Sequence, residues 1–252
     1  PGADEVAFDA WLKLGTNGVV TVAVPQVEMG QGVTTLLPQI AAVELGADWR
    51  KVAVERAPAS AVYANVPLAS QWADLAMPAM PSWFTGEEGM MVRRWAQDHA
   101  FTVTADGTEL AAYEAPVRAA AASARALLCM AAAKRWDVAW EDCDTQAGFV
   151  IHEGKRLSFG SLAQQAAEFD PPAPLPLREK PAREVAAAFP AGGALRFPRL
   201  DLPSKVDGSH TFAGDVRLPD MVYAAIRHGP IGRASFAGYD KSAASDVRGL
   251  IT

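Results

Sequence analysis

The sequence contains little cysteine, no long hydrophobic run and no excess of basic residues, and each of these absences excludes a class of protein. Two cysteines among 252 residues cannot supply the four ligands of an iron–sulfur cluster. Cys129 and Cys143 do not form a Cys-x-x-Cys pair, so we expect two structural thiols. No apolar stretch approaches the roughly 20 residues of a membrane-spanning helix. The formal net charge of -6 offers no basic surface to a nucleic acid.

Histidine is also scarce, and the four histidines are not spaced as metal ligands. We expect ordinary surface or hydrogen-bonded roles for His99, His152, His210 and His228. The Ser-Phe-Gly-Ser sequence over residues 158–161 does not match a nucleophile elbow, and a helix cap is the better explanation of Ser158 or Ser161. What the chain does have is a hydrophobic content of 50% over 252 residues, which can bury a sizeable core in one large domain or two smaller ones.

The beginning of the chain predicts a hairpin, a helix and a further strand. Residues 11–14 and 19–24 flank an Asn-Gly turn, which is the strongest short signal for a β-hairpin. Apolar residues recur at near-helical spacing over residues 34–45, and Pro38 belongs near the first turn of this helix, where a missing amide costs little. Residues 49–56 then return as a strand.

The middle of the chain has a less regular pattern. Residues 58–103 contain several prolines, tryptophans and methionines without a sustained period, and they predict a long loop with short pieces of regular structure. The alanine-rich residues 115–136 predict a long helix with arginine and lysine on a polar side. A short hairpin over residues 148–155 and a helix over residues 158–169 follow.

The composition then changes at a proline-rich segment. Residues 170–176 cannot continue a helix and favour an extended run. We therefore expect a first domain over residues 1–170, a linker over residues 171–197 and a second segment over residues 198–252.

The second segment contains two strand-like stretches, at residues 209–212 and 221–227. Taken with the earlier elements, they predict an α+β fold in which mixed sheets are packed with helices.

The sharpest chemical feature is the sequence Val-Glu-Met-Gly-Gln-Gly over residues 27–32, between a strand and the start of a helix. Gly30 and Gly32 permit close approach of the backbone, and the first amides of the helix are expected to be unpaired donors that suit an anion. Gln31 offers both a donor and an acceptor to a polar heterocycle or an oxo group. A Gly-x-Gly pair is weak evidence by itself, and the pattern fits a tight strand-to-helix turn equally well.

Two longer stretches carry a resemblance to a known family. Residues 25–45, with Asp-Trp at residues 48–49 and Val-Ala-Val-Glu at residues 52–55, are similar to the molybdopterin-binding segment of molybdenum hydroxylases. Matches within residues 198–226 resemble the opening of the hammerhead domain of these proteins. The chain therefore resembles the amino-terminal part of the molybdopterin-binding large subunit of the xanthine dehydrogenase and aldehyde oxidase superfamily, in the branch of the isoquinoline oxidoreductase beta subunits.

The resemblance implies that a part of the molybdenum cofactor-binding domain is followed by the start of an α/β hammerhead domain. It also implies a molybdenum centre held by a pterin dithiolene, as molybdopterin or its cytosine dinucleotide form. Such a centre oxidises an aldehyde, or a carbon next to nitrogen in an N-heterocycle, with oxygen taken from water. Met29, Gly30, Gln31 and Gly32 would lie against the cofactor, with Gln31 as the catalytic residue whose amide is close to the oxo ligand of the metal.

The resemblance further implies partners and a location. The general base of the family is a glutamate near the carboxyl end of the large subunit, outside these residues, so this chain alone should be inert. A second chain would carry the remaining large-subunit domains, since the sequence ends on an apolar, strand-like segment. Electrons would pass to two-iron two-sulfur clusters on a small subunit, with a cytochrome c as a candidate acceptor. The start lacks an initiator Met, so an export leader was either removed or never recorded. Together with the family branch, this predicts a periplasmic location, with the cytoplasm as the alternative.

One segment departs from the family pattern. Relatives carry Gly-Gly-Ser-Thr-Ser where this chain has Thr-Ala-Asp-Gly-Thr-Glu over residues 104–109, and Gly107 and Thr108 are the residues expected to bind the cofactor there. Asp106 and Glu109 bring negative charge toward an anionic cofactor, which would repel it unless they turn outward. This departure leaves open a second hypothesis, a cofactor-free scaffold or interaction subunit with the same fold.

Overall fold

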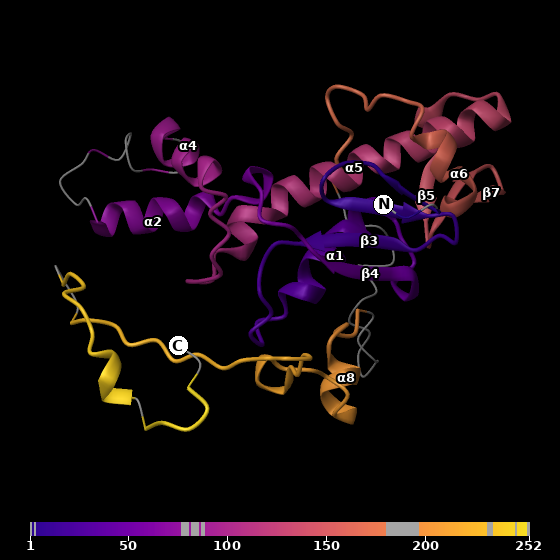
Figure 1. Cartoon of the computed structure of the whole chain (residues 1–252). Helices are drawn as coiled ribbons and strands as arrows, with labels where there is room; N and C mark the ends of the chain where they lie inside the picture. The colour runs from indigo at the N-terminus through magenta and orange to yellow at the C-terminus, as the bar shows by residue number, and fades with distance from the viewer. Residues whose placement is uncertain are drawn as a thin grey trace, which may run out of the picture. The chain divides into compact units, whose positions relative to one another are not determined.

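The protein, described by a computed structural model, contains two compact units, Pro1–His210 and Thr211–Thr252. In the first unit two β-sheets are combined with helices, among which α5 is the longest that the structure describes (Figure 1). The predicted α+β class with mixed sheets is therefore confirmed. The structure describes residues 2, 4–76, 81, 86, 89–179, 197–230, 234–244 and 246–250.

The first sheet contains the predicted hairpin. Strands β2 and β3 are antiparallel, and the Asn17 side chain accepts a hydrogen bond from the Val19 amide at 2.9 Å within the turn. Gly18 takes a left-handed conformation there, with a φ of 82°. The hairpin prediction is confirmed. In spatial order the strands of this sheet are β1 (Glu5–Ala7), β2 (Leu12–Gly15), β3 (Val20–Val24) and β4 (Val52–Arg56).

Helix α1 (Val33–Leu45) connects β3 to β4, and these two strands are parallel. Leu37, Ala41 and Leu45 recur at every fourth position and are buried in the main core. The predicted helix is confirmed, but the prediction for Pro38 is wrong, because this residue lies inside the helix beyond its first turn. A proline there removes one hydrogen bond of the helix, and burial of the apolar face offsets the loss.

Helix α5 (Glu109–Trp136) packs against both α1 and α6 (Phe159–Ala166). Small side chains such as Ala121, Ala124 and Ala132 lie on its buried side, and they allow neighbouring helices to approach closely. The helix predicted over the alanine-rich stretch is confirmed, and it begins earlier than predicted.

A second sheet lies near the carboxyl-terminal half of α5. Its strands β5 (Asp144–Gln146), β6 (Phe149–His152) and β7 (Lys155–Ser158) are antiparallel, which confirms the second hairpin and adds a strand to it. The Ser158 hydroxyl accepts a hydrogen bond from the Ser161 amide at 3.3 Å, which confirms the predicted helix cap. Short 3-10 helices in this unit lie at Trp49–Lys51, where β4 was expected to begin, and at Ala61–Tyr63 and Trp140–Asp142.

The prediction of a long loop over residues 58–103 is wrong. This region contains α2 (Val66–Ala76) and α4 (Met90–Asp98), which pack together around a small core of their own. Pro67 lies in the first turn of α2, where its missing amide costs little. Each helix is short, so neither produces an apolar period long enough to detect. Residues 77–80, 82–85 and 87–88 lie outside the described residues.

Part of the predicted linker belongs to the first unit and lies against α1 and β5. Residues 171–179 contain no helix or strand, and the Arg178 amide donates to the Glu44 carboxylate of α1 at 2.8 Å. The Arg178 guanidinium also donates to the Asp144 carboxylate at 2.8 Å, which joins this stretch to β5. The remainder of the linker, residues 180–196, lies outside the described residues. The linker boundaries stay a prediction.

Helix α8 (Leu202–Asp207) was not predicted from the sequence. Pro203 in its first turn and the left-handed Gly208 after its end are ordinary signals of helix boundaries. The strand predictions for residues 209–212 and 221–227 are wrong, because neither stretch pairs with a strand among the described residues. A strand is stable only when neighbouring strands accept and donate its backbone hydrogen bonds.

The second unit, Thr211–Thr252, has little regular structure among its described residues. It contains two 3-10 helices, Ala213–Asp215 and Lys241–Ala244, joined by irregular chain. The assignment of this segment to a hammerhead domain stays a prediction. Many of its large apolar side chains are exposed, including Phe212, Val222, Tyr223, Ile226, Phe236 and Tyr239.

Candidate functional site

The loop that joins β3 to α1 carries the predicted site residues. Gly30 and Gly32 both have positive φ values, 105° and 85°, which strongly favour glycine. A Cβ atom added to either glycine would meet nothing within 4 Å. The backbone on this side of the loop is therefore open to a flat ligand that approaches closely.

The Glu28 side chain occupies the amides at the start of α1. Its carboxylate accepts hydrogen bonds from the Gly30 amide at 2.8 Å, the Gly32 amide at 2.9 Å and the Thr34 amide at 3.1 Å, and from the Thr34 hydroxyl at 2.9 Å. The expectation that the first helical amides are unpaired donors is therefore wrong for Gly32 and Thr34. Burial raises the pKa of Glu28, but the hydrogen bonds from Gly32 and Thr34 outweigh this effect and leave the pKa below its ordinary value. The carboxylate stays ionised at neutral pH, and the positive amino-terminal end of the α1 dipole stabilises its negative charge.

The Gln31 amide bonds to the loop itself. Its Oε1 accepts from the Met29 amide at 2.6 Å, and its Nε2 donates to the Val27 carbonyl at 2.8 Å. A third and longer hydrogen bond of 3.3 Å joins Nε2 to the Glu109 carboxylate. Met29 is 66% exposed, so the predicted residues 29–32 lie on the surface of the loop.

The structure brings this loop next to the second predicted segment, residues 104–109. The Val27 amide donates to the Thr104 hydroxyl at 2.9 Å, and Gln31 reaches Glu109 at the start of α5. Gly107 has a φ of 65°, and nothing lies within 4 Å of a Cβ added there. The two segments predicted to bind the cofactor are thus neighbours in space, although they are far apart in the sequence.

Thr108 differs from the other predicted residues in its burial. Its hydroxyl donates to the Ala105 carbonyl at 3.1 Å and accepts from the Asn65 amide group at 2.9 Å. This side chain is therefore used inside the protein, and its role in binding a cofactor stays a prediction.

The two acidic residues of the departing segment turn in different directions. Asp106 accepts a hydrogen bond from the Trp72 ring nitrogen of α2 at 3.1 Å, which holds its carboxylate toward that helix. Glu109 points toward Gln31 and keeps its negative charge beside the loop. Of these two residues, Glu109 is therefore the one whose carboxylate would repel an anionic ligand at the loop.

Sequence reasoning missed a buried polar network behind the loop. Gln26 donates through Nε2 to the Thr102 carbonyl at 3.2 Å and to the Tyr113 hydroxyl at 3.0 Å. The Tyr113 hydroxyl donates in turn to the Tyr63 carbonyl at 3.0 Å, and burial raises the pKa of this phenol, so it stays neutral. Gln26 Oε1 is buried and has no hydrogen-bond partner among the described residues. The position of Gln26 next to residues 27–32 is the one feature of the sequence that indicates a role at the loop. Nothing in the sequence connects Gln26 to Tyr113.

No protein metal centre is formed in the described part of the chain, where no group of three or more histidine, cysteine or acidic side chains could hold a metal ion. His99 and His152 interact with backbone carbonyls at 2.8 and 3.1 Å. Cys129 and Cys143 are free thiols, and burial raises the pKa of Cys129 to about 12. The Cys129 thiol therefore stays protonated and unreactive at neutral pH.

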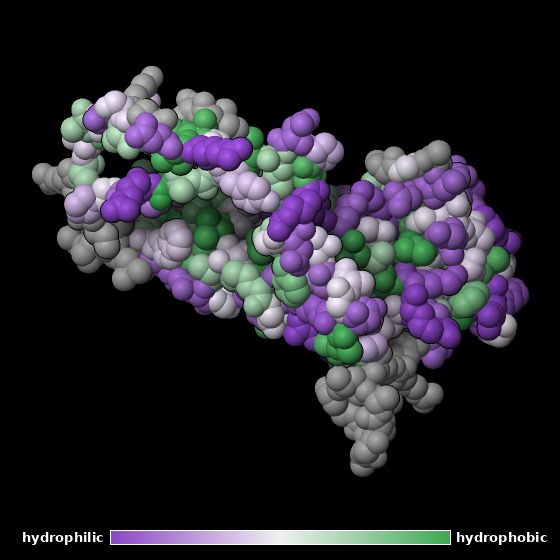
Figure 2. All heavy atoms as spheres, turned by 60° about the horizontal axis from the view of Figure 1, so that its bottom comes forward, coloured by the Kyte–Doolittle hydropathy of each residue, from purple (hydrophilic) through white to green (hydrophobic). Residues whose placement is uncertain are grey.

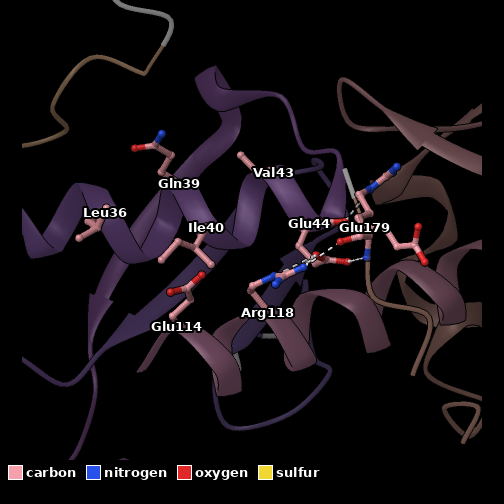
Figure 3. A pocket seen from close by; sticks show the side chains of 9 residues that line it. Leu36, Gln39, Ile40, Val43, Glu44, Glu114, Arg118 and Glu179 are labelled. Carbon is pink, nitrogen blue, oxygen red and sulfur yellow. Dashed lines mark hydrogen bonds and ion pairs between the residues drawn. The ribbon is translucent and has the colours of Figure 1, made fainter. Parts of the chain in front are cut away.

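A separate pocket of about 310 Å³ lies where α1 meets α5 and the stretch that contains Arg178 (Figure 3). Glu44 is almost completely buried at its wall, and its carboxylate accepts from Arg118 and Arg125 of α5 at 3.1 Å each. Arg118 also donates to the Arg178 carbonyl at 2.9 Å. Glu44, Arg118 and Arg178 are therefore engaged with one another, which indicates a structural role for these three residues.

Hydrophobic residues are also exposed on the surface of the molecule. In Figure 2, green hydrophobic residues interrupt the purple hydrophilic surface at several places. The side chains of Val27 and Met29 are exposed, so the loop presents apolar as well as polar groups. Such a combination suits a ligand with a flat ring system and polar edges.

The comparison with protein families identifies the class. Residues 2–82 match the family model of the molybdopterin cofactor-binding domain, and this match includes β1 to β4, α1 and the whole loop of residues 25–32. This part of the chain belongs to that family. Its members are named for the cofactor that the exposed loop was predicted to bind.

Individual relatives narrow the assignment. The chain is 32% identical to the beta subunit of isoquinoline 1-oxidoreductase from Brevundimonas diminuta over 279 residues, which cover 99% of this chain and 32% of the relative. It is 24% identical over 257 residues to the membrane-bound aldehyde dehydrogenase [pyrroloquinoline-quinone] of Gluconacetobacter polyoxogenes, covering 100% of this chain and 28% of the relative. It is 35% identical over 129 residues to a nicotinate dehydrogenase subunit of Pseudomonas putida, covering 50% of this chain and 10% of the relative.

These relatives are named as oxidoreductases or their subunits, and the predicted resemblance to the isoquinoline oxidoreductase beta subunits is confirmed. The chain spans about a third of the length of the first two relatives. Within the described ranges, no helix combines the length and the apolarity that crossing a bilayer requires.

Proposed function

We propose that this chain is the cofactor-binding part of a molybdenum hydroxylase that oxidises an aldehyde or an N-heterocycle. One observation carries the proposal: the loop of a molybdopterin cofactor-binding domain presents two open glycines on either side of Gln31. The residues fit a flat, polar cofactor, because Gly30 and Gly32 leave the space that a side chain would fill. A bound molybdenum–pterin group would supply the oxidation chemistry, with oxygen taken from water.

In this proposal the role of the chain itself is to bind and orient the cofactor. Gly30 and Gly32 would let the backbone approach the cofactor, and the Gln31 amide would supply a polar group beside it. The 3.3 Å hydrogen bond from Gln31 to Glu109 is the longest of its three, and it is the one that a ligand can replace at least cost. Glu28 holds the loop in shape while this exchange takes place.

The remaining parts of the enzyme are proposals of the same kind. The general base and the substrate pocket would come from large-subunit domains on a second chain, and electrons would leave through iron–sulfur clusters on a small subunit toward a cytochrome c. A periplasmic location fits such a complex. Isoquinoline, aldehyde and nicotinate appear in the names of the relatives and define the substrate classes to test first.

The alternative is a scaffold or interaction subunit that kept the fold without the cofactor. The Glu109 carboxylate beside Gln31 favours this alternative, because it would repel an anionic group at the loop. Metal analysis of the purified complete protein separates the two hypotheses. About one molybdenum per molecule is expected for the hydroxylase, and molybdenum at background level would support the scaffold.

A Gln31→Ala substitution tests the site directly. We expect the turnover of the complete enzyme to fall by about 100-fold, as for the loss of one positioned hydrogen-bond donor, while its unfolding free energy changes by about 1 kcal/mol or less. Gln39→Ala, on α1 but away from the loop, is the matched control and should leave turnover unchanged. Equal turnover in the wild type and the Gln31 variant would contradict a catalytic role for this residue.

A further inference from the structure

Arg199 joins the Gln31 loop to a distant part of the chain. Its guanidinium donates through Nη1 to the Gly30 carbonyl at 3.2 Å and through Nη2 to the Glu28 carboxylate at 3.3 Å. The same guanidinium forms a two-point pair with Asp201, with Nε at 2.9 Å from Oδ1 and Nη2 at 2.7 Å from Oδ2. The Arg199 guanidinium therefore contacts the Gly30 carbonyl and the carboxylates of Glu28 and Asp201.

Other contacts also hold the segment that carries Arg199 against α1 and the residues that precede β4. The Leu200 amide donates to the Thr35 hydroxyl of α1 at 3.0 Å. The Trp49 ring nitrogen donates to the Pro198 carbonyl at 3.3 Å, and the ring packs edge-on against Phe197. Residues 197–200 are thus held on both sides of Arg199, which limits the positions that its guanidinium can take.

The charges around Arg199 are balanced. Glu28 and Asp201 are the two carboxylates, and Lys205 adds a second cation with its ammonium at 2.6 Å from Asp201. The hydrogen bond from Arg199 holds the pKa of Asp201 well below its usual range, so this carboxylate stays charged and keeps the guanidinium oriented. A lysine at position 199 could not make the same contacts, because they require a planar fork of donors.

We propose that Arg199 and Glu28 are positioning residues that hold the Gly30-Gln31-Gly32 loop in the shape that presents Gln31. This inference rests on the proposed function, since the ligand of the loop is the cofactor proposed above. Glu28 shapes the loop from inside through the amides of Gly30, Gly32 and Thr34. Arg199 holds Glu28 and the Gly30 carbonyl from outside, so formation of the site is coupled to docking of residues 197–201.

Hydrogen exchange of the complete protein tests the loop shape without depending on turnover. In Arg199→Met we expect the amides of Gly30 and Gly32 to exchange about tenfold faster or more, because their acceptor Glu28 loses its outer contact, while amides of the α1 interior are unchanged. Arg50→Met is the matched control, since Arg50 forms the same two-point pair with Asp48, at 3.0 and 2.8 Å, away from the loop.

A second measurement separates positioning from general stability. Molybdenum per folded molecule should fall about fivefold or more in Arg199→Met and in Glu28→Gln, with no such loss in Arg50→Met, and Arg199→Lys should not restore it. The double variant should lose little more than either single variant, because both remove one coupled contact. Unchanged exchange at Gly30 and Gly32 would overturn the inference, as would faster exchange with undiminished molybdenum. If the wild-type protein carries no molybdenum, the proposed function fails. The exchange result alone then decides whether Arg199 and Glu28 hold the loop in shape.

Discussion

At the scale of single residues, the glycines differ in what surrounds them. Gly30 and Gly32 face open space, and this makes them available to a ligand. Gly160, near the start of α6, lies against the turn of the first hairpin, where an added Cβ would be 2.7 Å from the Gly18 amide nitrogen. Gly160 therefore serves the packing of α6 against the first sheet, whereas the glycines of the loop serve the surface.

This difference predicts opposite effects of two alanine substitutions. Gly160→Ala should lower the unfolding free energy by about 1–3 kcal/mol through overpacking, with molybdenum per folded molecule unchanged. Gly30→Ala should cost a similar amount through backbone strain, but it should also reduce molybdenum because its methyl group fills the open side of the loop. Denaturant unfolding and metal analysis of both variants make the comparison. Full metal content in Gly30→Ala would argue that the cofactor does not approach this side.

At the scale of elements, one buried carboxylate joins three segments. Glu44 lies on α1 and Arg118 lies on α5 (Figure 3). Arg125 also lies on α5, and Arg178 lies in the stretch after α6. Ion pairs of this kind contribute little when they are exposed, but the loss of one partner from a buried pair leaves a charge without compensation.

Glu44→Gln should therefore be strongly destabilising. We expect the unfolding free energy to fall by about 2–4 kcal/mol, because the partly buried guanidinium groups of Arg118 and Arg125 lose their counter-charge and solvent screens Arg118 in part. Asp98→Asn provides the control, since Asp98 forms an exposed ion pair with Arg94 within α4, and its loss should cost about 1 kcal/mol or less. Denaturant titration of the two variants measures both values, and equal losses would show that burial of Glu44 is energetically unimportant.

At the scale of the whole molecule, the two units differ in how much apolar surface they bury. The first unit has a continuous core that includes β2, β3, α1, α5 and α6. The second unit leaves large apolar side chains such as Tyr223, Ile226 and Phe236 exposed among its described residues. Exposed apolar surface of this extent is a mark of interaction sites, which fits a proposal in which further domains cover it.

Limited proteolysis tests this difference. Trypsin should cut the 252-residue chain after Arg217 and Arg227 of the second unit well before it cuts after Arg118 or Arg125, which lie on a packed helix. Mass spectrometry of the earliest fragments gives the order of cleavage. Early cuts within α5 would contradict the description of the first unit as the stable one.

Local features of the fold could be predicted from the sequence, and features that depend on distant partners could not. The first hairpin follows from Asn17 and Gly18, and α1 and α5 follow from long apolar or alanine-rich periods. Helices α2 and α4 were missed because each is stabilised mainly by the other. The strands predicted over residues 209–212 and 221–227 failed for the opposite reason: their local preference has no partner strand among the described residues.

The candidate site divides in the same way. By itself the sequence determined the family, the turn conformations of Gly30 and Gly32 and the placement of Gln31 between them, because these depend on residues next to one another along the chain. Tertiary structure alone decided that Glu28 fills the helix amides and that Arg199, 171 residues away from Glu28, holds it there. The physical reason is that hydrogen bonds and ion pairs act over a few ångströms in space, whatever the separation along the chain.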